Sequence, residues 1–182
     1  MEPLTPTSKW QIVIKFSLIF ALTSIGVSVV FYILGMHTAK NWISTFLNFL
    51  IISGSIYFGI RARRDETLNG FISFGQGVGT GMQIIFFGGL IISIYFLVFV
   101  NYIDPEFMAN LIENVKREMI EKGDSEEKIE TTIHWMKKMQ SPMLMFVMGL
   151  LANLIYGLIV SLIVSIFTRK ENPDGLYNTL DN

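Results

Sequence analysis

Four long apolar segments constrain this chain more than any other feature of its sequence. They contain no Asp, Glu or Arg and a single Lys, and they cover Ile12–Leu34, Trp42–Ile60, Phe71–Val100 and Met143–Phe167. A hydrocarbon core about 30 Å thick needs roughly 20 apolar residues in a helix, whereas the helices of soluble domains are shorter and carry a polar face. The sequence therefore predicts an all-α membrane protein with four transmembrane helices and no strand.

The first segment is longer than the roughly 7–15 residues of a signal-peptide core, and no small-x-small cleavage site follows it, so we expect a retained span. The chain has 182 residues, a net charge of −1 and no cysteine. The lack of cysteine excludes disulfides, thiolate catalysis and Cys-based zinc sites. The expected surroundings are the lipid bilayer, and we expect no nucleic acid among the partners.

Basic residues predict the orientation, because Lys and Arg concentrate on the cytoplasmic side. In a four-span chain one side carries a cluster of them, namely Lys9, Lys15, Arg61, Arg63, Arg64, Arg169 and Lys170. The other side has Lys40 and a long loop, 101–142, whose net charge is −3. Lys plus Arg counts are equal on the two sides, so the prediction depends on the clustered arginines, which we interpret as topology anchors rather than as a grip on anionic lipid. Both termini are expected in the cytoplasm and 101–142 outside.

The loop between spans three and four predicts an αα-hairpin over 104–141. Asp104 and Pro105 suit a helix start, Gly123 suits a helix end, and Asp124 with Glu127 resembles a capping box. Apolar residues recur at helical spacing on both sides of Gly123, at Phe107, Leu111, Ile112, Val115, Met119, Ile129, Ile133 and Met136. Ser141–Pro142 repeats the cap and proline before the last span. We expect one transmembrane domain over 1–170 and a disordered tail over 171–182.

Glycines crowd the third segment, at positions 75, 77, 79, 81, 88 and 89. A nucleotide-binding loop would need G-x-G-x-x-G after a strand or Gly-Lys-Ser/Thr, and neither pattern is present. On a helix, Gly75 and Gly79 share one face, and Gly77, Gly81 and Gly88 share another that points nearly the opposite way. Glycine lets membrane helices approach closely. The third span is therefore predicted to be central, with a neighbour on each face.

The fourth segment has a matching pattern, with small or polar residues at every fourth position: Gly149, Asn153, Gly157, Ser161 and Ser165. We predict that they form a helix-packing surface. A polar stripe on the third segment consists of Ser73, Gln76, Thr80 and Gln83. We favour hydrogen bonds between helices, at roughly 0.6 kcal/mol each, for this stripe. The alternative is a polar path across the membrane, with Asn48 and Asn153 opposite.

Several stretches resemble a bacterial four-span membrane family known as domain of unknown function 4199: GFISFGQGVGTG at 70–81, YIDPEF at 102–107, SP at 141–142 and GLIVSLIVSIF at 157–167. The resemblance covers almost the whole chain in the right order. It implies four helices, a helical hairpin between spans three and four, and residence in the bacterial inner membrane. It implies no activity, so it carries over no catalytic residue. The glycines at 77 and 79 depart from the family, where larger residues are expected.

The sequence gives little support for ion-coupled transport, metal binding or catalysis. Ion-coupled carriers hold an ionisable residue inside the bilayer, and no span has one at its middle. His134, Glu130 and His37 together satisfy a zinc site in principle, but a surface histidine paired along a helix is the simpler interpretation. Asp104 is the best-placed carboxylate, and a helix cap accounts for it. We therefore expect no catalytic, cofactor-binding or metal-binding residue, and no enzyme.

The remaining functions are interaction and passage. We expect a structural or interaction protein, or an accessory subunit, that self-associates or binds another membrane protein and presents its hairpin outside. The alternative is a homo-oligomeric channel or uncoupled permease that uses the polar stripe of the third span.

Overall fold

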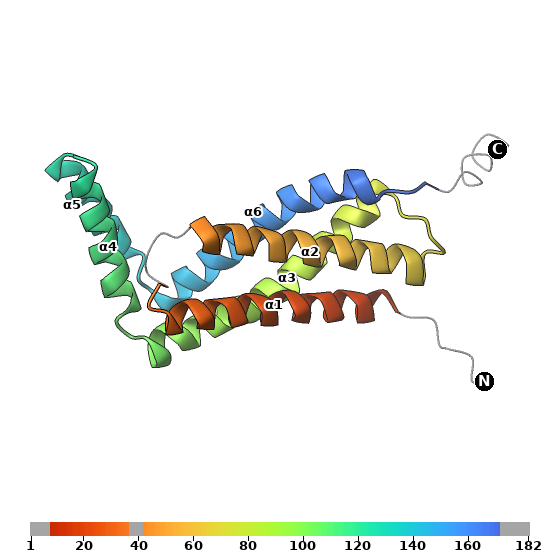
Figure 1. The fold of residues 1–182 in the computed structure, drawn as a ribbon, viewed down its shortest axis with the longest axis horizontal. Helices are drawn as coiled ribbons and strands as arrows, with labels where there is room; N and C mark the ends of the chain where they lie inside the picture. Colours follow the sequence, from red (N-terminus) through yellow and green to blue (C-terminus); the bar gives the residue numbers. More distant parts are fainter. Residues whose placement is uncertain (1–7, 37–41, 172–182) are drawn as a thin grey trace.

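The computed structural model describes residues 8–36 and 42–171. Four of its helices are long and apolar enough to cross a membrane: α1 (Lys9–Ile33), α2 (Trp42–Thr67), α3 (Phe74–Val98), which continues into the π-helical segment η1 (Phe99–Ile103), and α6 (Pro142–Thr168). Two shorter helices, α4 (Phe107–Glu121) and α5 (Glu126–Lys138), form the hairpin between spans three and four (Figure 1). The described residues hold no strand, only one isolated bridge between Ile72 and Lys170. The predicted fold class is confirmed.

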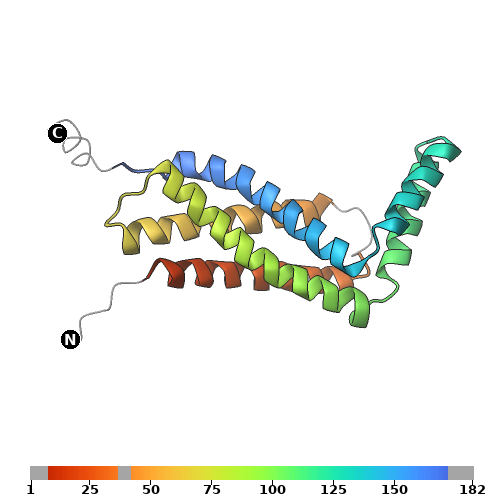
Figure 2. The same ribbon diagram turned by 180° about the vertical axis from the view of Figure 1, so that it is seen from behind.

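The two ends of the bundle differ. Figures 1 and 2 show α4 and α5 projecting from one end, while the start of α1 and the end of α6 lie at the other. Four antiparallel crossings require this arrangement, because an even number of spans returns the chain to its starting side. The predicted tail beyond residue 171 and the loop residues His37 and Lys40 lie outside the described residues.

The second span is longer than the sequence indicates. The predicted span ends at Ile60, before the three arginines, but α2 continues to Thr67. Side chains of residues 61–67 make contacts one helical turn apart that stabilise this extension. Arg61 Nε lies 3.7 Å from the Asp65 carboxylate, and Thr67 Oγ1 donates to the Arg63 carbonyl at 2.7 Å. The helix ends where the backbone turns left-handed, at Asn69 and Gly70 with φ of 52° and 86°.

The hairpin has the predicted design with two shifted boundaries. α4 begins at Phe107, two residues after the predicted start at Pro105, with Glu106 in the N-cap position. Gly123 ends α4 as predicted, at φ 74°, a conformation that residues with a Cβ adopt rarely. The predicted cap at Asp124 is wrong: Ser125 caps α5 and accepts from the Lys128 N–H. Asp124 instead pairs with the Lys128 ammonium at 2.5 Å.

Before the last span, Ser141 occupies the N-cap position of α6 and Pro142 its first turn, so the predicted position of the helix start is confirmed, although the Ser141 side chain makes no capping hydrogen bond. Proline suits the position because its missing N–H has no intrahelical acceptor there.

The third span is central, because α3 packs against α1, α2 and α6. Its longest contact is an antiparallel seam with α6, in which each four-residue step along α3 meets a four-residue step back along α6. The successive pairs are Gly77 with Ser165, Gly81 with Ser161, Ile85 with Gly157, and Gly89 with Asn153. In three of the pairs a glycine of α3 faces a larger residue of α6, and in one the glycine is on α6. At the end of the bundle opposite the hairpin, two backbone hydrogen bonds between Ile72 and Lys170 (2.8 and 2.9 Å) continue the same register.

A different glycine of α3 serves the contact with α1. A Cβ added at Gly88 would meet the Phe20 ring and lie 3.0 Å from the Ser17 carbonyl. In return, Ser17 Oγ donates across the interface to the Ile84 carbonyl at 3.1 Å as well as to Val13 in its own helix at 2.7 Å. The close approach therefore brings a hydroxyl within reach of a neighbouring backbone, which is how membrane helices associate without a hydrophobic driving force.

Three predicted packing glycines make no such contact. No atom of the described chain outside the local helix lies within 4 Å of a Cβ added at Gly75, Gly79 or Gly149. The expectation that Gly75 and Gly79 form a second packed face is thus wrong within one chain. The second neighbour of α3 contacts Gly88 and Ile84, because α1 lies about a quarter turn away from α6 around α3 rather than opposite to it.

We predict opposite effects of one substitution at two glycines of the same helix. Gly81→Ala places a Cβ 2.9 Å from Ser161 Cβ and 3.0 Å from Ile56 Cγ2, so it should lower the free energy of unfolding by about 1–3 kcal/mol through overpacking. Gly79→Ala meets nothing and should be neutral or stabilising by up to about 1 kcal/mol through helix propensity. Thermal unfolding in mild detergent measures both. Equal effects of the two substitutions would contradict the close approach of α3 and α6.

Candidate functional site

The hairpin forms a surface of its own outside the bundle. The principal contacts of α4 and α5 are with each other, and Figure 1 shows the pair standing clear of the four spans. Ile112 and Met119 are the buried residues of α4, whereas no residue of α5 is buried. Two helices enclose only one side of their apolar stripes, so the other side stays open.

A groove lies along the junction of α4 and α5. Two adjoining hollows of about 240 and 370 Å³ share Lys116, Ile129 and Glu130 in their walls. The rest of the lining consists of Ile120, Asp124, Glu126, Ile133, His134 and Lys137. Isoleucines form the apolar part, and Ile120 is 57% exposed although it is fully aliphatic. The result is an apolar groove with charged edges of both signs.

The charges of the hairpin fall into two groups. Away from the groove, Lys122 pairs with Glu118 at 2.5 Å, and the exposed i,i+4 pair of Arg117 with Glu113 (3.1 Å) contributes about 0.3–0.5 kcal/mol. The hydrogen bond that Lys122 donates to the Glu118 carboxylate also raises the pKa of Lys122. At the groove, Lys116, Glu130 and Lys137 form no ion pair with any described residue. These three charges are available to an incoming partner.

The candidate metal ligands do not assemble. His134 and Glu130 both line the groove, but the described residues contain no group of three His, Asp or Glu side chains that could hold a metal ion. His37, the third predicted ligand, lies outside the described residues.

The predicted polar stripe of the third span divides into separate structures. Ser73 is the N-cap of α3, where its Oγ accepts from the Gln76 N–H at 3.3 Å and the Gln76 side chain accepts from the Ser73 N–H at 3.1 Å. This reciprocal capping box satisfies two backbone donors at the helix start. Both residues therefore lie at the N-terminal end of α3 and not on a path through the middle of the span. The pattern S-x-x-Q at 73–76 carried this signal in the sequence.

Thr80 is bonded to Arg63, an arginine that the sequence analysis interprets as a topology anchor. Arg63 reaches from α2 to α3, where its Nη1 donates to Thr80 Oγ1 at 2.5 Å and to the Gln76 carbonyl at 3.1 Å. Thr80 is fully buried and donates in turn to the Gln76 carbonyl at 2.7 Å. These three bonds close a small network between the two helices. Thr80 is bonded to Arg63 of α2 and to the Gln76 carbonyl of its own helix, so it links the two spans.

The neighbouring arginines behave differently. Arg64 pairs with Asp65 at 2.8 Å, and Arg61 approaches the same carboxylate at the surface. Only Arg63 turns into the bundle, and its buried Nε has no hydrogen-bond partner in the described chain. Three arginines in four residues cannot share one face of a helix, since each step rotates by 100°. That rotation was the available signal, but it required knowing that α2 continues past Ile60.

Gln83 is the last residue of the predicted polar stripe, and it takes no part in the network of Arg63, Thr80 and Gln76. Its side-chain oxygen is buried and has no hydrogen-bond donor in the described chain.

The predicted packing residues of α6 do not all contact α3. Asn153, Gly157 and Ser161 lie on the α3–α6 seam, while Gly149 lies beyond the last pair of that seam.

The class of protein follows from this geometry: a helical, multi-pass membrane protein with a helical hairpin between its third and fourth spans. The chain matches the family model described as "Protein of unknown function (DUF4199)" over residues 15–170, and it belongs to that family. No curated protein and no solved structure matches the chain.

We predict that Arg63→Gln destabilises the bundle far more than Arg61→Gln does. Arg63 donates two hydrogen bonds to α3, and hydrogen bonds to charged groups contribute about 1.5–3 kcal/mol. Arg61 is half-exposed and only 3.7 Å from its partner, so its loss should cost at most about 1 kcal/mol. Unfolding by heat or by a denaturing detergent compares the two variants, which lose the same charge from the same helix. Equal losses would mean that Arg63 acts as a surface charge.

Proposed function

We propose that this chain is a non-enzymatic membrane protein that docks a helix of another membrane-associated protein in the groove of its outer hairpin. The observation that carries the proposal is the open apolar groove between α4 and α5, with Ile120 57% exposed at its edge. Helix-in-groove recognition uses this combination of an apolar floor and polar edges.

The chemistry of the groove specifies the partner. Its floor of isoleucines suits an amphipathic helix with apolar residues at i, i+3, i+4 and i+7. Lys116 and Lys137 suit carboxylates on that helix, and Glu130 suits a basic residue, because none of the three has an ion-pair partner among the described residues. Charges at the edge mainly select the partner and its direction, while the apolar floor supplies affinity. A second copy of this chain is the competing occupant.

The four spans serve the proposal as a base. The α3–α6 seam and the Arg63 network fix the helices of the bundle to one another, and the hairpin leaves the bundle through η1 at one side and Pro142 at the other. A docking module connected to two fixed spans is presented at a constant distance from the membrane.

We also propose the bacterial inner membrane as the location, with both termini cytoplasmic and the hairpin outside. The cluster of basic residues at the end opposite the hairpin supports this orientation. Exposed aromatic residues at both ends of the spans, Trp10 at one end and Trp42 and Tyr102 at the other, suit the two interfaces of a bilayer.

In intact cells, an impermeant thiol reagent should label Ser125→Cys and spare Arg64→Cys. The reverse labelling pattern would overturn the orientation.

The alternative of a homo-oligomeric channel or permease gains little from the geometry. Within one chain, Ser73 and Gln76 bond to each other and Thr80 is fully buried and bonded to Arg63. Gln83 alone of the stripe keeps an unpaired buried oxygen. The polar stripe therefore supports contacts between helices more than passage of a solute.

We predict that Ile120→Glu abolishes partner binding while Ala109→Glu preserves it. Both substitutions add the same charge to an exposed position of α4, but only Ile120 lines the groove. An apolar anchor at the centre of an interface typically accounts for 2 kcal/mol or more, about a 30-fold change in affinity. Cross-linking in native membranes, followed by purification in mild detergent and mass spectrometry, measures what stays attached.

A foreign protein that is recovered with the wild type and with Ala109→Glu, and lost with Ile120→Glu, supports the proposal. Recovery of cross-linked copies of this chain alone would replace the foreign partner by a second copy. A foreign protein retained equally by both variants would place its binding site elsewhere.

A further inference from the structure

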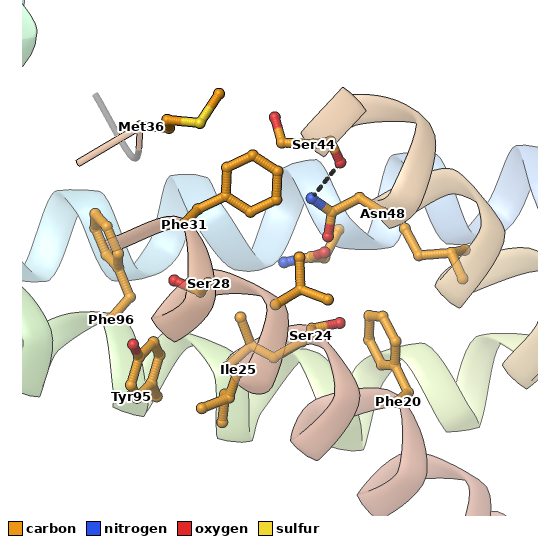
Figure 3. Close-up of a pocket in the computed structure, with 14 residues that line it drawn as sticks. Phe20, Ser24, Ile25, Ser28, Phe31, Met36, Ser44, Asn48, Tyr95 and Phe96 are labelled. Carbon is orange, nitrogen blue, oxygen red and sulfur yellow. Dashed lines mark hydrogen bonds between the residues drawn. The ribbon is translucent and has the colours of Figure 1, made fainter. Parts of the chain in front are cut away.

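A cavity of about 290 Å³ lies inside the bundle, in the half nearer the hairpin. Its walls come from α1, α2, α3 and α6, and Figure 3 shows Ser24 and Ser28 of α1 between Asn48 of α2 on one side and Tyr95 and Phe96 of α3 on the other. A single water occupies about 30 Å³ in the liquid, so the space exceeds what one or two bridging waters need. It approaches the size of small-molecule sites.

The lining combines apolar side chains with polar, uncharged ones. Six of its side chains carry hydroxyl or amide groups: Ser24, Ser28, Ser44, Asn48, Tyr95 and Asn153. The others are aliphatic, aromatic or methionine, and no Asp, Glu, Lys, Arg or His of the described chain is among them. A charged occupant would meet no counter-charge among these described residues, and an unpaired charge between membrane spans costs several kcal/mol. The described lining therefore suits an uncharged occupant.

The hydrogen bonds of the two asparagines specify what the occupant must offer. Asn48 Nδ2 donates to the Ser44 carbonyl at 3.0 Å, and Asn153 Nδ2 donates to the Gly149 carbonyl at 3.1 Å, each within its own helix. No donor of the described chain reaches either amide oxygen. Two free acceptors call for a ligand with hydroxyl donors. The buried hydroxyls of Ser24 and Tyr95 also lack partners in the described chain.

The cavity continues sideways into a lipid-facing groove. A second hollow of about 400 Å³ between α2 and α6 shares Asn48, Ile52 and Asn153 with the cavity. Its outer walls include Phe49 and Tyr156, which are 48% and 56% exposed. Gly149 leaves this groove open, since nothing lies within 4 Å of a Cβ added there. The two hollows thus join a polar chamber to an apolar track along the bundle surface.

We propose that this two-part site binds an uncharged, hydroxyl-bearing lipid from the bilayer. Its head occupies the cavity and donates hydrogen bonds to the amide oxygens of Asn48 and Asn153, and its acyl chain lies in the groove between α2 and α6. A quinone fits less well, because its carbonyls are acceptors and leave both amide oxygens unpaired. The inference is independent of the hairpin and of the partner it docks.

The test uses a monoacylglycerol that carries a photoreactive diazirine and an alkyne in its acyl chain. The full chain is reconstituted in phosphatidylcholine vesicles with this probe, irradiated, and digested to map the labelled peptides. We expect saturable labelling of peptides from α2 and α6. Unlabelled monoacylglycerol should compete, whereas the methyl ester of the same fatty acid should not, since it is uncharged but donates no hydrogen bond.

Three substitutions locate the site. Asn48→Leu removes one amide acceptor and should lower saturable labelling about five-fold or more, the equivalent of one net hydrogen bond. Ser28→Leu fills the cavity without touching either amide and should lower labelling by a similar factor. Gln83→Leu is the matched control, because Gln83 is a membrane amide with an unpaired oxygen outside this lining, and it should label like the wild type.

Labelling that does not saturate, or that the methyl ester competes equally well, overturns the proposal and leaves a water-filled cavity. So does undiminished labelling of Ser28→Leu, provided that its melting temperature matches that of the wild type. If Asn48→Leu fails to fold, Ser28→Leu and the two competitors still decide the question.

Discussion

The close approach of α3 and α6 is the constraint on which the rest of the bundle depends. Membrane helices gain little from the hydrophobic effect, because lipid tails are as apolar as leucine, so backbones must come near enough for van der Waals contact. Gly77 and Gly81 on α3 and Gly157 on α6 permit this, each beneath a side chain of the facing helix. With α3 fixed against α6, its other sides receive Ser17 of α1 and Arg63 of α2.

The same seam explains why a cavity lies on the hairpin side. The four-residue pairing runs from Gly77 with Ser165 to Gly89 with Asn153, and one step further Gly149 faces nothing. Asn153 therefore belongs both to the last contact of the seam and to the lining of the cavity. Where the seam ends, small side chains no longer bring helices together, and Ser24 and Ser28 of α1 line the cavity instead. Tight packing at one end of the bundle and a polar chamber near the other follow from one pattern.

The features that depend on periodicity could be predicted from the sequence: four spans, the helical hairpin, Gly123 as a helix end and the four-residue pattern of α6. Side-chain direction could not. Gly75 and Gly79 have the same spacing as Gly77 and Gly81, and only the position of α6 decides which pair is packed. Arg63 looked like Arg61 and Arg64 until α2 was seen to continue past Ile60. In α1, Ser17, Ala21, Ser24 and Ser28 follow helical spacing, and that small-residue pattern was the missed signal for the cavity wall.

The register of α3 against α6 is tested most directly by disulfide cross-linking, for which the chain is suited because it has no cysteine of its own. Disulfides form only when Cα atoms lie about 4.4–6.8 Å apart with suitable direction. In native membranes under mild oxidation, Gly89→Cys with Asn153→Cys should cross-link rapidly within one chain, because the two Cβ atoms lie 3.6 Å apart, and Gly89→Cys with Ile155→Cys should not, because Ile155 lies on the exposed side of α6. Efficient cross-linking of the second pair, or none of the first, would contradict the seam.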